Sequence, residues 1–589
     1  MKYNVVIIDS GISYKCAKVN CVDLCTREKD GMDYIDHGTQ IVNIILQEDS
    51  CLRVLMIKIC NEYDDFSILN FYDALDYILI NDIACDVINV SLGSLSVPDF
   101  KTFDYYVERL LKKDIVLVAS FHPLAMSFPA VHNSVIGVDV SNELKEGEFV
   151  TIDNSPIDIV GTAGIIRVKD ISGKINLQKG SSFVAAQISG KIAKYIKDNN
   201  IIQDKNNIAR QYIKKISKKN ISGNYGESNI SNGTYFTKSI ESAIVFPFNK
   251  EIHSIAANED MLGFSIKEYF DFDISVNKGK KICDILPYTN NQKRISSFSK
   301  IDWADPFDTV ICGHCKEYEY ITQKSLYMDI MKQCKKYNKQ IYLFESPSTF
   351  DKEVRSFCPI ISCRFDTNIF MGKLYKIGKP VISIMGTSSV QGKFSLQLRL
   401  RRRLLEIGYK VSSVGTEPSG YLFGFDAVIP MGYNSEMVMN SYEFVTLINN
   451  VLHNVECNDP DLIIVGSQSG TVPLTCDNLG NMSFKQYELL LAICPDAVVL
   501  CANVFDDIEY IKRTIQFIES SCGARVIAIV VSVLSAPQSG YLLRSKRNVL
   551  SATSMVSHCQ SLKDSFNIPV YSQFDNIDYL IENIQEFFS

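Results

Sequence analysis

The sequence predicts an α/β protein made of doubly wound domains, in which parallel strands alternate with helices. Apolar runs with the composition of buried strands recur along the chain, and runs with helical spacing of apolar residues separate them. The chain has 589 residues, which is more than one hydrophobic core usually organises. A polar stretch after residue 202 interrupts the alternation before it begins again. Together these observations predict three such domains.

The first domain is expected over residues 1–202. Its strand-like runs lie at Val5–Ile8, Val54–Ile59, Val87–Leu92, Ile115–Ala119 and Val135–Val140. The next residues, 203–239, are rich in Lys, Asn, Ser and Gly, and this composition predicts a linker.

The second domain is expected over residues 240–375 and the third over residues 376–589. Strand-like runs of the second domain lie at Ala243–Phe248, Thr309–Gly313 and Gln340–Phe344. Those of the third domain lie at Val381–Met385, Leu462–Val465, Ala497–Leu500 and Val526–Val531. Helix-like runs follow these strands, as they do in parallel sheets.

Composition and charge narrow the class of protein. The net charge is −7, so the molecule as a whole is not built to bind nucleic acid. The short basic tract of Arg399 and Arg401–Arg403 is interpreted as a solvated helix face. No apolar run reaches the roughly 18–20 residues that span a bilayer, so no membrane contact is expected.

The cysteines and the start of the chain bear on location. The 18 cysteines are scattered, and several lie in strand-like runs, which suits reduced core thiols better than a disulfide framework. The first strand-like run begins almost at Met1, so neither a signal peptide nor a folded pro-segment is expected. A cytoplasmic location is therefore expected.

Three short runs contain the residue types for nucleophilic acyl transfer, which needs a hydroxyl, a base and a carboxylate that orients the base. Asp9 ends the first apolar strand, His37 opens a helix-like run, and Ser182 starts another. This order, and the run Gly180–Ala186, resemble the subtilisin-like serine peptidases, or subtilases. The resemblance implies that the three residues form a catalytic triad, and that the helix N-terminus at Ser182 stabilises an oxyanion.

Two further segments match the subtilase pattern. Ser91, Leu92 and Gly93 resemble the edge that pairs with the substrate backbone as an added strand. Ser127–Ala130, followed by Ser134–Val138, resembles the family's Tyr-Pro-Ala and Val-Ile-x-Val segment. These ordered matches extend the resemblance over the whole first domain.

The main departure from the family concerns the oxyanion side chain. Subtilases carry an Asn after a buried strand, and this chain has His122 there. A histidine ring N–H can donate a hydrogen bond in place of the Asn amide. The alternatives are that His122 is a surface-loop histidine, and that Ser182 only caps a helix in an inactive pseudo-peptidase.

The third domain opens with a strand, a glycine-bounded loop and a Gly-Lys pair that begins a helix. The segment runs from Gly386 and Thr387 to Gly392, Lys393 and Ser395. Backbone N–H groups in such a loop surround a phosphate, the lysine neutralises its charge, and the serine hydroxyl ligates Mg²⁺. The pattern predicts binding of ATP or another nucleotide with Mg²⁺, and the alternative is a helix start that binds no nucleotide.

The spacing of this loop resembles dethiobiotin synthetase and related P-loop proteins. One related family joins a Rossmann-like half to a P-loop half and includes proteins assigned as D-glutamate N-acetyltransferases. Residues 240–375 resemble the Rossmann-like half, and residues 376–589 resemble the P-loop NTPase-like half. Together they are similar to proteins of bacterial peptide-maturation systems, which accompany ribosomally made peptide natural products (RiPPs).

One departure weakens the expectation of nucleotide hydrolysis. Where the relatives carry an acidic residue after the strand at 462–465, this chain has Gly466 and Ser467. The carboxylate that would hold Mg²⁺ is missing from that position. Glu417 and Asp426 are the acidic residues that could replace it.

The second domain contains a short run with two thiols and an imidazole, Cys312–Cys315. A metal site usually needs a second ligand pair at suitable spacing, and the sequence offers none. A core role at the end of a strand is therefore expected, and the glycine fingerprint of dinucleotide binding is absent.

The leading hypothesis is an intracellular subtilisin-like serine endopeptidase with a P-loop module that binds the peptide, gates cleavage or modifies the product with ATP. The resemblances imply that its substrate is a small precursor peptide whose leader must be removed. The second hypothesis is a peptide-binding pseudo-peptidase whose P-loop half performs ATP-dependent ligase or transferase chemistry. A third is a nucleotide-dependent regulatory protease outside natural-product synthesis.

Overall fold

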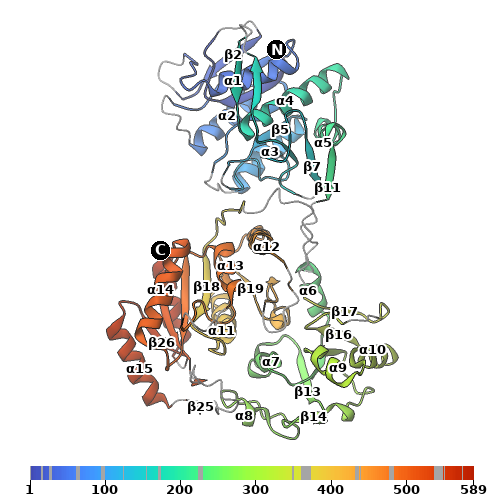
Figure 1. Ribbon diagram of the computed structural model, residues 1–589, viewed down its shortest axis with the longest axis vertical. Coiled ribbons are helices and arrows are strands. Elements are labelled where there is room, and N and C mark those ends of the chain that lie inside the picture. Colours follow the sequence, from blue (N-terminus) through green and yellow to red (C-terminus); the bar gives the residue numbers. More distant parts are fainter. Residues whose placement is uncertain are drawn as a thin grey trace. The chain divides into compact units, whose positions relative to one another are not determined.

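The computed structural model describes residues 2–14, 18–25, 30–61, 67–94, 100–123, 125–153, 155–169, 174–222, 230–347, 351–359, 373–431, 437, 439–475, 483–532, 534–535, 548–549, 551–573 and 575–589. The chain forms two compact units (Figure 1). One comprises Met1–Tyr225 with Arg364–Gly378, and the other comprises Gly226–Cys363 with Lys379–Ser589. Both units contain largely parallel sheets covered by helices, so the α/β fold class is confirmed.

The first unit is organised around one large sheet with the order β11-β7-β8-β6-β5-β4-β1-β3-β2 in its described residues. Neighbouring strands are parallel except β7 and β8. The strands are β1 (Tyr3–Asp9), β2 (Val19–Asp23), β3 (Val54–Lys58), β4 (Cys85–Val90), β5 (Val116–Ser120), β6 (Ile136–Ser141), β7 (Val150–Asp153), β8 (Ile159–Thr162) and β11 (Lys219–Ser222). A separate hairpin pairs β9 (Ile166–Lys169) with β10 (Ile175–Gln178).

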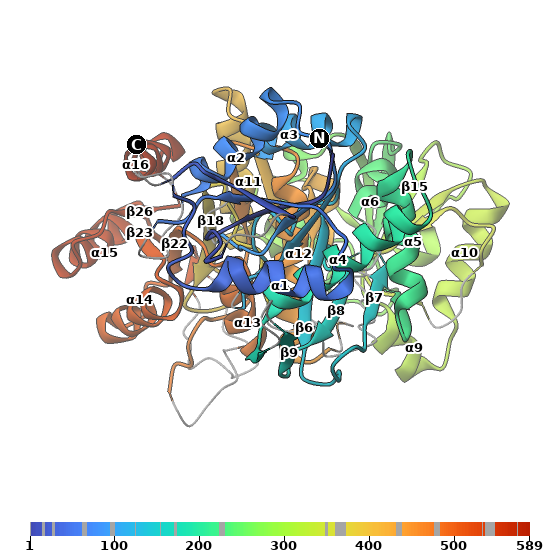
Figure 2. The same ribbon diagram turned by 90° about the horizontal axis from the view of Figure 1, so that it is seen from above.

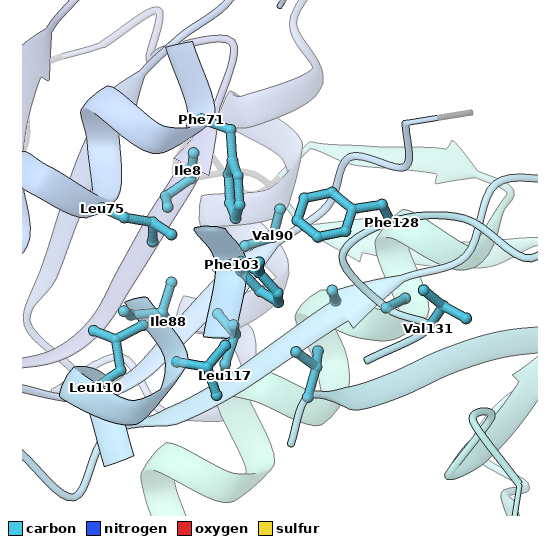
Figure 3. Close-up of a cluster of buried hydrophobic side chains, with 14 of the residues drawn as sticks. Ile8, Phe71, Leu75, Ile88, Val90, Phe103, Leu110, Leu117, Phe128 and Val131 are labelled. Atoms are coloured by element: carbon cyan, nitrogen blue, oxygen red, sulfur yellow. The ribbon is translucent and has the colours of Figure 1, made fainter. Parts of the chain in front are cut away.

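Helices cover both faces of this sheet (Figure 2), which explains why its central strands are apolar throughout. One face packs against α1 (His37–Glu48), α4 (Ser181–Asp198) and α5 (Lys205–Ile216). The other packs against α2 (Ile68–Ile80) and α3 (Phe100–Lys112). In Figure 3, side chains of β1, β4 and β5 meet those of α2 and α3, with Phe71, Phe103 and Phe128 close together.

The segment expected as a linker, residues 203–239, contains regular structure. It includes α5, and β11, which adds to the sheet of the first unit beside β7. Ala209 and Ile213 lie four residues apart in α5 and are both buried. The overall composition is polar, yet this helical spacing supplies an apolar stripe that packs α5 onto the core.

The second unit contains two large sheets in which every pair of neighbouring described strands is parallel, and a short antiparallel pair of β24 (Leu534–Ser535) and β25 (Asn548–Val549). The first has the order β14-β13-β12-β15-β16-β17, with β12 (Ser242–Phe246), β13 (Ser265–Asp271), β14 (Ile295–Ser297), β15 (Thr309–Cys312), β16 (Gln340–Leu343) and β17 (Ser356–Phe357). Its helices are α6 (Ile230–Thr237), α7 (Ile252–Ala257), α8 (Ile282–Ile285), α9 (Lys316–Thr322) and α10 (Leu326–Lys336).

The other sheet of this unit has the order β20-β19-β21-β18-β22-β23-β26. Its strands are β18 (Val381–Gly386), β19 (Val411–Gly415), β20 (Ala427–Val428), β21 (Leu462–Val465), β22 (Ala497–Ala502), β23 (Arg525–Val531) and β26 (Val570–Ser572). Its helices are α11 (Lys393–Glu406), η3 (Pro418–Phe423), α12 (Ser441–Glu456), α13 (Phe484–Ile493), α14 (Ile508–Cys522), α15 (Ala552–Ser565) and α16 (Ile577–Phe588).

The two sheets of the second unit share contacts and a hydrophobic core. The Tyr342 hydroxyl donates to the Pro418 carbonyl over 2.6 Å, and the hydroxyls of Ser254 and Ser419 lie 3.3 Å apart. Apolar side chains from β12, β16, α11 and η3 belong to one buried cluster. The Rossmann-like and P-loop-like segments therefore pack together as a single unit.

A short segment after the first sheet of the second unit returns to the first unit. Lys373 Nζ donates to both carboxylate oxygens of buried Asp139, each at 2.6 Å. The Met126 N–H donates to the Leu374 carbonyl, and Met126 forms a parallel bridge with Tyr375. The first unit is thus built from two separate stretches of sequence.

In the part of the chain that the structure describes, no helix combines the length and the apolar character needed to cross a membrane.

Candidate functional site

Asp9 and His37 meet at the carboxyl end of β1. Asp9 is the last residue of this buried strand, and its carboxylate is fully buried. Its Oδ1 lies 2.7 Å from Nδ1 of His37, the first residue of α1, and accepts the Ser10 backbone N–H at 2.7 Å. A ring that donates through Nδ1 to a carboxylate accepts protons through Nε2.

The helix that carries His37 packs closely against the loop after β1, and this requires a glycine. An ideal Cβ on Gly38 would lie 2.4 Å from the Gly11 carbonyl oxygen and 3.2 Å from Asp9 Oδ1. The Gly38 N–H also donates to the Ser10 hydroxyl at 2.9 Å. The His-Gly pair in the sequence therefore has a local physical cause, because a larger residue would push α1 away from Asp9.

Ser182 lies in the first turn of α4, next to the ends of two strands. Its hydroxyl donates to the Ser91 carbonyl at 2.9 Å, and the Ser91 hydroxyl donates to the Ser182 carbonyl at 3.1 Å. The Ser181 hydroxyl donates to the Phe121 carbonyl at 2.6 Å. The ring of Phe183 lies 5.4 Å from the His37 ring between centroids, so Asp9, His37 and the start of α4 come together in one place.

The proposed peptide-binding edge and His122 lie beside this helix start. An ideal Cβ on Gly93 would lie 2.9 Å from the backbone nitrogen of His122 and 2.8 Å from the Ser127 hydroxyl. The His122 N–H donates to that hydroxyl at 2.7 Å. The Ser91 side chain is buried and engaged with α4, and Leu92 packs against the core.

The P-loop segment forms at the end of β18, as its spacing predicts. Gly386 ends the strand and Gly392, with a φ of 75°, precedes α11, whose first residue is Lys393. The ammonium group of Lys393 donates to the Ser388 carbonyl at 2.7 Å. Burial lowers the pKa of Lys393 to about 8, because the charged form is removed from water.

A cavity of about 480 Å³ lies over this loop. Gly392, Lys393 and Ser395 line it, whereas Gly386 and Thr387 do not. The Thr387 hydroxyl is fully buried, donates to Asp506 at 2.5 Å and accepts from Gln391 at 2.6 Å, so it holds the loop in shape.

Several residues around this cavity were missed by sequence reasoning. Asn258 donates from its side-chain amide to the Ser395 hydroxyl at 3.1 Å, and Gln573 donates to the Gln391 carbonyl at 2.6 Å. Lys250 also lines the cavity, from the loop after β12. The signal that could have indicated Lys250 is its position after a central strand, because ligands of doubly wound sheets bind at the carboxyl ends of strands.

The donor set around the cavity fits a nucleotide with Mg²⁺ in part. Lys393 and the α11 N-terminus suit phosphate, and the Ser395 hydroxyl is a usual Mg²⁺ ligand. Gly466 supplies no carboxylate at the end of β21. Of the two acidic residues considered as replacements, Glu417 lines the cavity, whereas Asp426 accepts the Ser413 N–H at 2.7 Å and is not in its wall.

The Cys312–Cys315 run lies in the core, as expected from the sequence. The two sulfurs are 3.8 Å apart and both cysteines are buried. His314 Nδ1 pairs with Glu345 at 3.1 Å, and the Glu345 carboxylate accepts the Cys315 N–H. Within the described ranges no group of metal-ligating side chains large enough to hold a metal ion is found.

The basic tract on α11 is engaged by its own unit. Arg399 donates to the Gln573 carbonyl at 2.9 Å, and Arg401 donates to the Gly424 carbonyl at 2.6 Å. Arg403 pairs with Asp578 at 2.6 Å. The expected solvated face is thus used in large part to attach α11 to neighbouring segments.

Comparison with known proteins gives a family match for one part of the chain. Residues 368–570 match the model of the DUF1611 P-loop domain, a domain of unknown function. No curated protein matches the chain.

Two solved structures are similar to parts of the chain. A DUF1611 family protein from Anabaena variabilis is 11% identical with a TM-score of 0.44, over 59% of this chain and 100% of that one. A cold-adapted subtilisin-like serine proteinase is 16% identical with a TM-score of 0.28, over 33% of this chain and 76% of that one.

Proposed function

We propose that the chain is a subtilisin-like serine endopeptidase joined to a nucleotide-binding P-loop module. The observation that carries the proposal is the buried Asp9 carboxylate, which holds His37 through Nδ1 beside the first turn of α4, where Ser182 lies. Carboxylate, imidazole and serine in this chain order are the parts of a serine peptidase, and they arise here from three separate elements.

In the proposed mechanism Ser182 Oγ attacks the scissile carbonyl of a peptide and forms the new C–O bond. His37 accepts the hydroxyl proton at Nε2 and then gives it to the leaving amine, and Asp9 stabilises the imidazolium that forms. The C–N bond breaks as the amine leaves, water then attacks the acyl-enzyme with His37 again as base, and the ester C–O bond breaks as His37 returns the proton to Ser182 Oγ. The hydroxyl must first leave the Ser91 carbonyl, to which it now donates.

Two further groups complete the proposed site. The backbone N–H groups at the start of α4 and the ring of His122 stabilise the oxyanion. A peptide lies along the backbone of Ser91–Gly93 as an added strand, since Gly93 keeps this edge close to His122. Such a site accepts an extended peptide, and the sequence resemblances favour the leader of a ribosomally made precursor.

The proposed location is the cytoplasm. Among the described cysteines five are fully buried, namely Cys60, Cys312, Cys315, Cys334 and Cys501. Buried cysteines spread through the cores in this way suit a reducing compartment better than a disulfide framework does.

The P-loop cavity is proposed to bind ATP or another nucleotide. When bound with its Mg²⁺, the nucleotide supplies a phosphoryl group that is activated for transfer or hydrolysis. Lys393 neutralises phosphate charge, and the α11 N-terminus directs N–H groups at it.

Incubation of the purified chain with candidate precursor peptides tests the peptidase proposal. The wild type is expected to cleave, and Ser182→Ala is expected to lose at least about 10³-fold in rate, because no other group replaces the nucleophile. Cleavage at equal rates by the two proteins would refute the proposal.

A second candidate function is favoured by one observation, the hydrogen bond that holds the Ser182 hydroxyl on the Ser91 carbonyl. In this alternative the first unit binds peptides without cleaving them, and the P-loop half performs ATP-dependent ligase or transferase chemistry. Peptide binding that survives in Ser182→Ala, with product formation lost only in Lys393→Ala, would support it over the endopeptidase.

A further inference from the structure

The position where related P-loop proteins carry an acidic residue is closed to a side chain here. An ideal Cβ on Gly466 would lie 2.3 Å from Oε1 of Gln397. The Gln397 amide is buried and donates to the carbonyls of Val414 at 2.9 Å and Ile464 at 3.1 Å. An acidic side chain at residue 466 would displace the Gln397 amide, which these two hydrogen bonds hold in place. A carboxylate ligand for Mg²⁺ would therefore have to come from another element.

The cavity wall contains one acidic residue among those described, Glu417. It follows β19, the strand next to β21 in the sheet, and precedes the 3₁₀ turn η3. The carboxyl ends of neighbouring parallel strands meet at one edge, so this turn brings Glu417 to the side of the cavity that residue 466 would have served. Lys393 and Ser395 lie in the same wall.

Glu417 shares the cavity with several positively charged side chains. Lys250, Lys393 and Arg399 also line the cavity and suit an anion. An ionised carboxylate would repel the phosphates that these cations attract, unless a metal ion lies between carboxylate and phosphate.

We infer that Glu417 supplies the carboxylate for the nucleotide's Mg²⁺, in place of the acid missing at residue 466, with the Ser395 hydroxyl as its partner ligand. Mg²⁺ in nucleotide sites is commonly held by one or two carboxylates, the phosphates and water, so one glutamate is sufficient. This inference rests on the proposed nucleotide binding, and it gives the site a metal ligand that has moved from the end of one strand to the end of its neighbour.

Titration of the full chain with ATP, in excess EDTA and in MgCl₂, tests the inference by calorimetry. In the wild type Mg²⁺ is expected to strengthen ATP binding. In Glu417→Gln, binding without Mg²⁺ is expected to be equal or tighter, because a repelling charge is removed. The factor by which Mg²⁺ increases the affinity for ATP is expected to be about 10- to 100-fold smaller than in the wild type, which is the size of effect seen when residues that support a metal site are removed. Glu417→Asp is expected to retain part of it.

The matched control is Asp426→Asn, because Asp426 is the other acidic residue in this stretch and lies outside the cavity wall. It is expected to keep the wild-type response to Mg²⁺. A wild-type response in Glu417→Gln, or its loss in Asp426→Asn alone, would overturn the inference while leaving nucleotide binding intact. Failure of the wild type to bind ATP in either buffer would instead overturn the proposed nucleotide site. Electron paramagnetic resonance of the ATP complex with Mn²⁺ in place of Mg²⁺ gives a second measure. The Mn²⁺ spectrum is expected to change in Glu417→Gln and to stay as in the wild type in Asp426→Asn.

Discussion

The Asp9 carboxylate has one task that an amide cannot perform. Its Oδ1 accepts hydrogen bonds from both Ser10 N–H and His37 Nδ1. In Asp9→Asn the side chain keeps its size and an oxygen that can accept both hydrogen bonds, but it loses the negative charge that stabilises the imidazolium formed when His37 accepts the Ser182 proton. Peptide cleavage is expected to fall by about 10⁴-fold in kcat with little change in thermal stability. Unchanged kcat in this variant would mean that His37 is not the base.

The buried lysine of the P-loop predicts a pH dependence of nucleotide binding. Burial lowers the pKa of Lys393 to about 8 in the ligand-free protein, and phosphate binding favours the charged form. Affinity should therefore be constant below pH 8 and fall up to tenfold per unit above it, with proton uptake on binding near pH 8. Calorimetry in buffers of different ionisation enthalpy measures that uptake. A flat affinity from pH 7 to pH 9.5 would contradict the expectation.

Single residues differ in how far the sequence could predict them. Asp9, His37 and Ser182 could be found because each begins or ends an element, and strand ends and helix starts leave local patterns. Asn258 could not, because it meets Ser395 across 137 residues of sequence and has no motif of its own. Long-range contacts of this kind depend on how two sheets pack, which composition does not encode.

Helix α4 is attached to the sheet by a chain of buried polar groups. The Ser189 hydroxyl donates to Asn89 Oδ1 at 2.8 Å, and Asn89 donates to the Ser91 hydroxyl at 2.8 Å. Both Ser189 and Asn89 are fully buried. Ser189→Ala leaves a buried acceptor without its donor and is expected to cost about 1–3 kcal/mol in the free energy of unfolding.

Urea unfolding followed by a signal from the first unit measures this cost. Ser520→Ala is the control, because this serine is exposed and, among the described residues, its hydroxyl bonds to carbonyls of its own helix, those of Gln516 and Phe517. It is expected to change stability by less than about 0.5 kcal/mol. An unchanged midpoint in Ser189→Ala would show that the buried chain does not hold α4.

Elements were predicted best where apolar spacing was strong and least well where polar composition hid it. The buried strands β1, β4 and β18 agree with the apolar runs in the sequence within a few residues. Helix α5 was hidden because most of its residues are charged or polar, although Ala209 and Ile213 carry its packing. Composition averages over a segment, whereas a helix needs only one apolar stripe.

The chain leaves the first unit, forms part of the second, and then returns to the first. One ion pair attaches the returning segment to the first unit. Lys373 lies in the segment that returns to the first unit, and it donates to both oxygens of Asp139, 234 residues away. Lys373→Met leaves this buried carboxylate without its cation and is expected to cost about 3–5 kcal/mol.

The pH dependence of that cost has a definite sign. Burial raises the pKa of Asp139 above its usual value even with Lys373 present, so the unpaired carboxylate titrates higher still. A group whose folded pKa is raised stabilises the fold at low pH and loses that contribution as pH rises through the folded pKa. In thermal unfolding, the loss of stability of Lys373→Met relative to the wild type should therefore be larger at pH 8 than at pH 5. Asp139→Asn in the same chain should recover much of it, and an equal deficit at both pH values would contradict this explanation.

The return of this segment is a feature that the sequence did not indicate. The alternation of strands and helices predicted the α/β class and the location of most sheets. It placed residues 240–375 in one domain, because nothing in a local pattern shows that Lys373 pairs with a carboxylate near the beginning of the chain. An ion pair between distant residues is visible only once both elements are folded.

Labelling with a fluorophosphonate probe tests whether Asp9, His37 and Ser182 act as a peptidase site. Folded full-length protein is treated with the probe, with and without ATP, and the adduct is located by mass spectrometry. The adduct is expected on Ser182, absent in Ser182→Ala and strongly reduced in His37→Ala, since the probe reacts only with an activated serine. No adduct on Ser182 in the folded wild type, under either condition, would contradict the proposed endopeptidase.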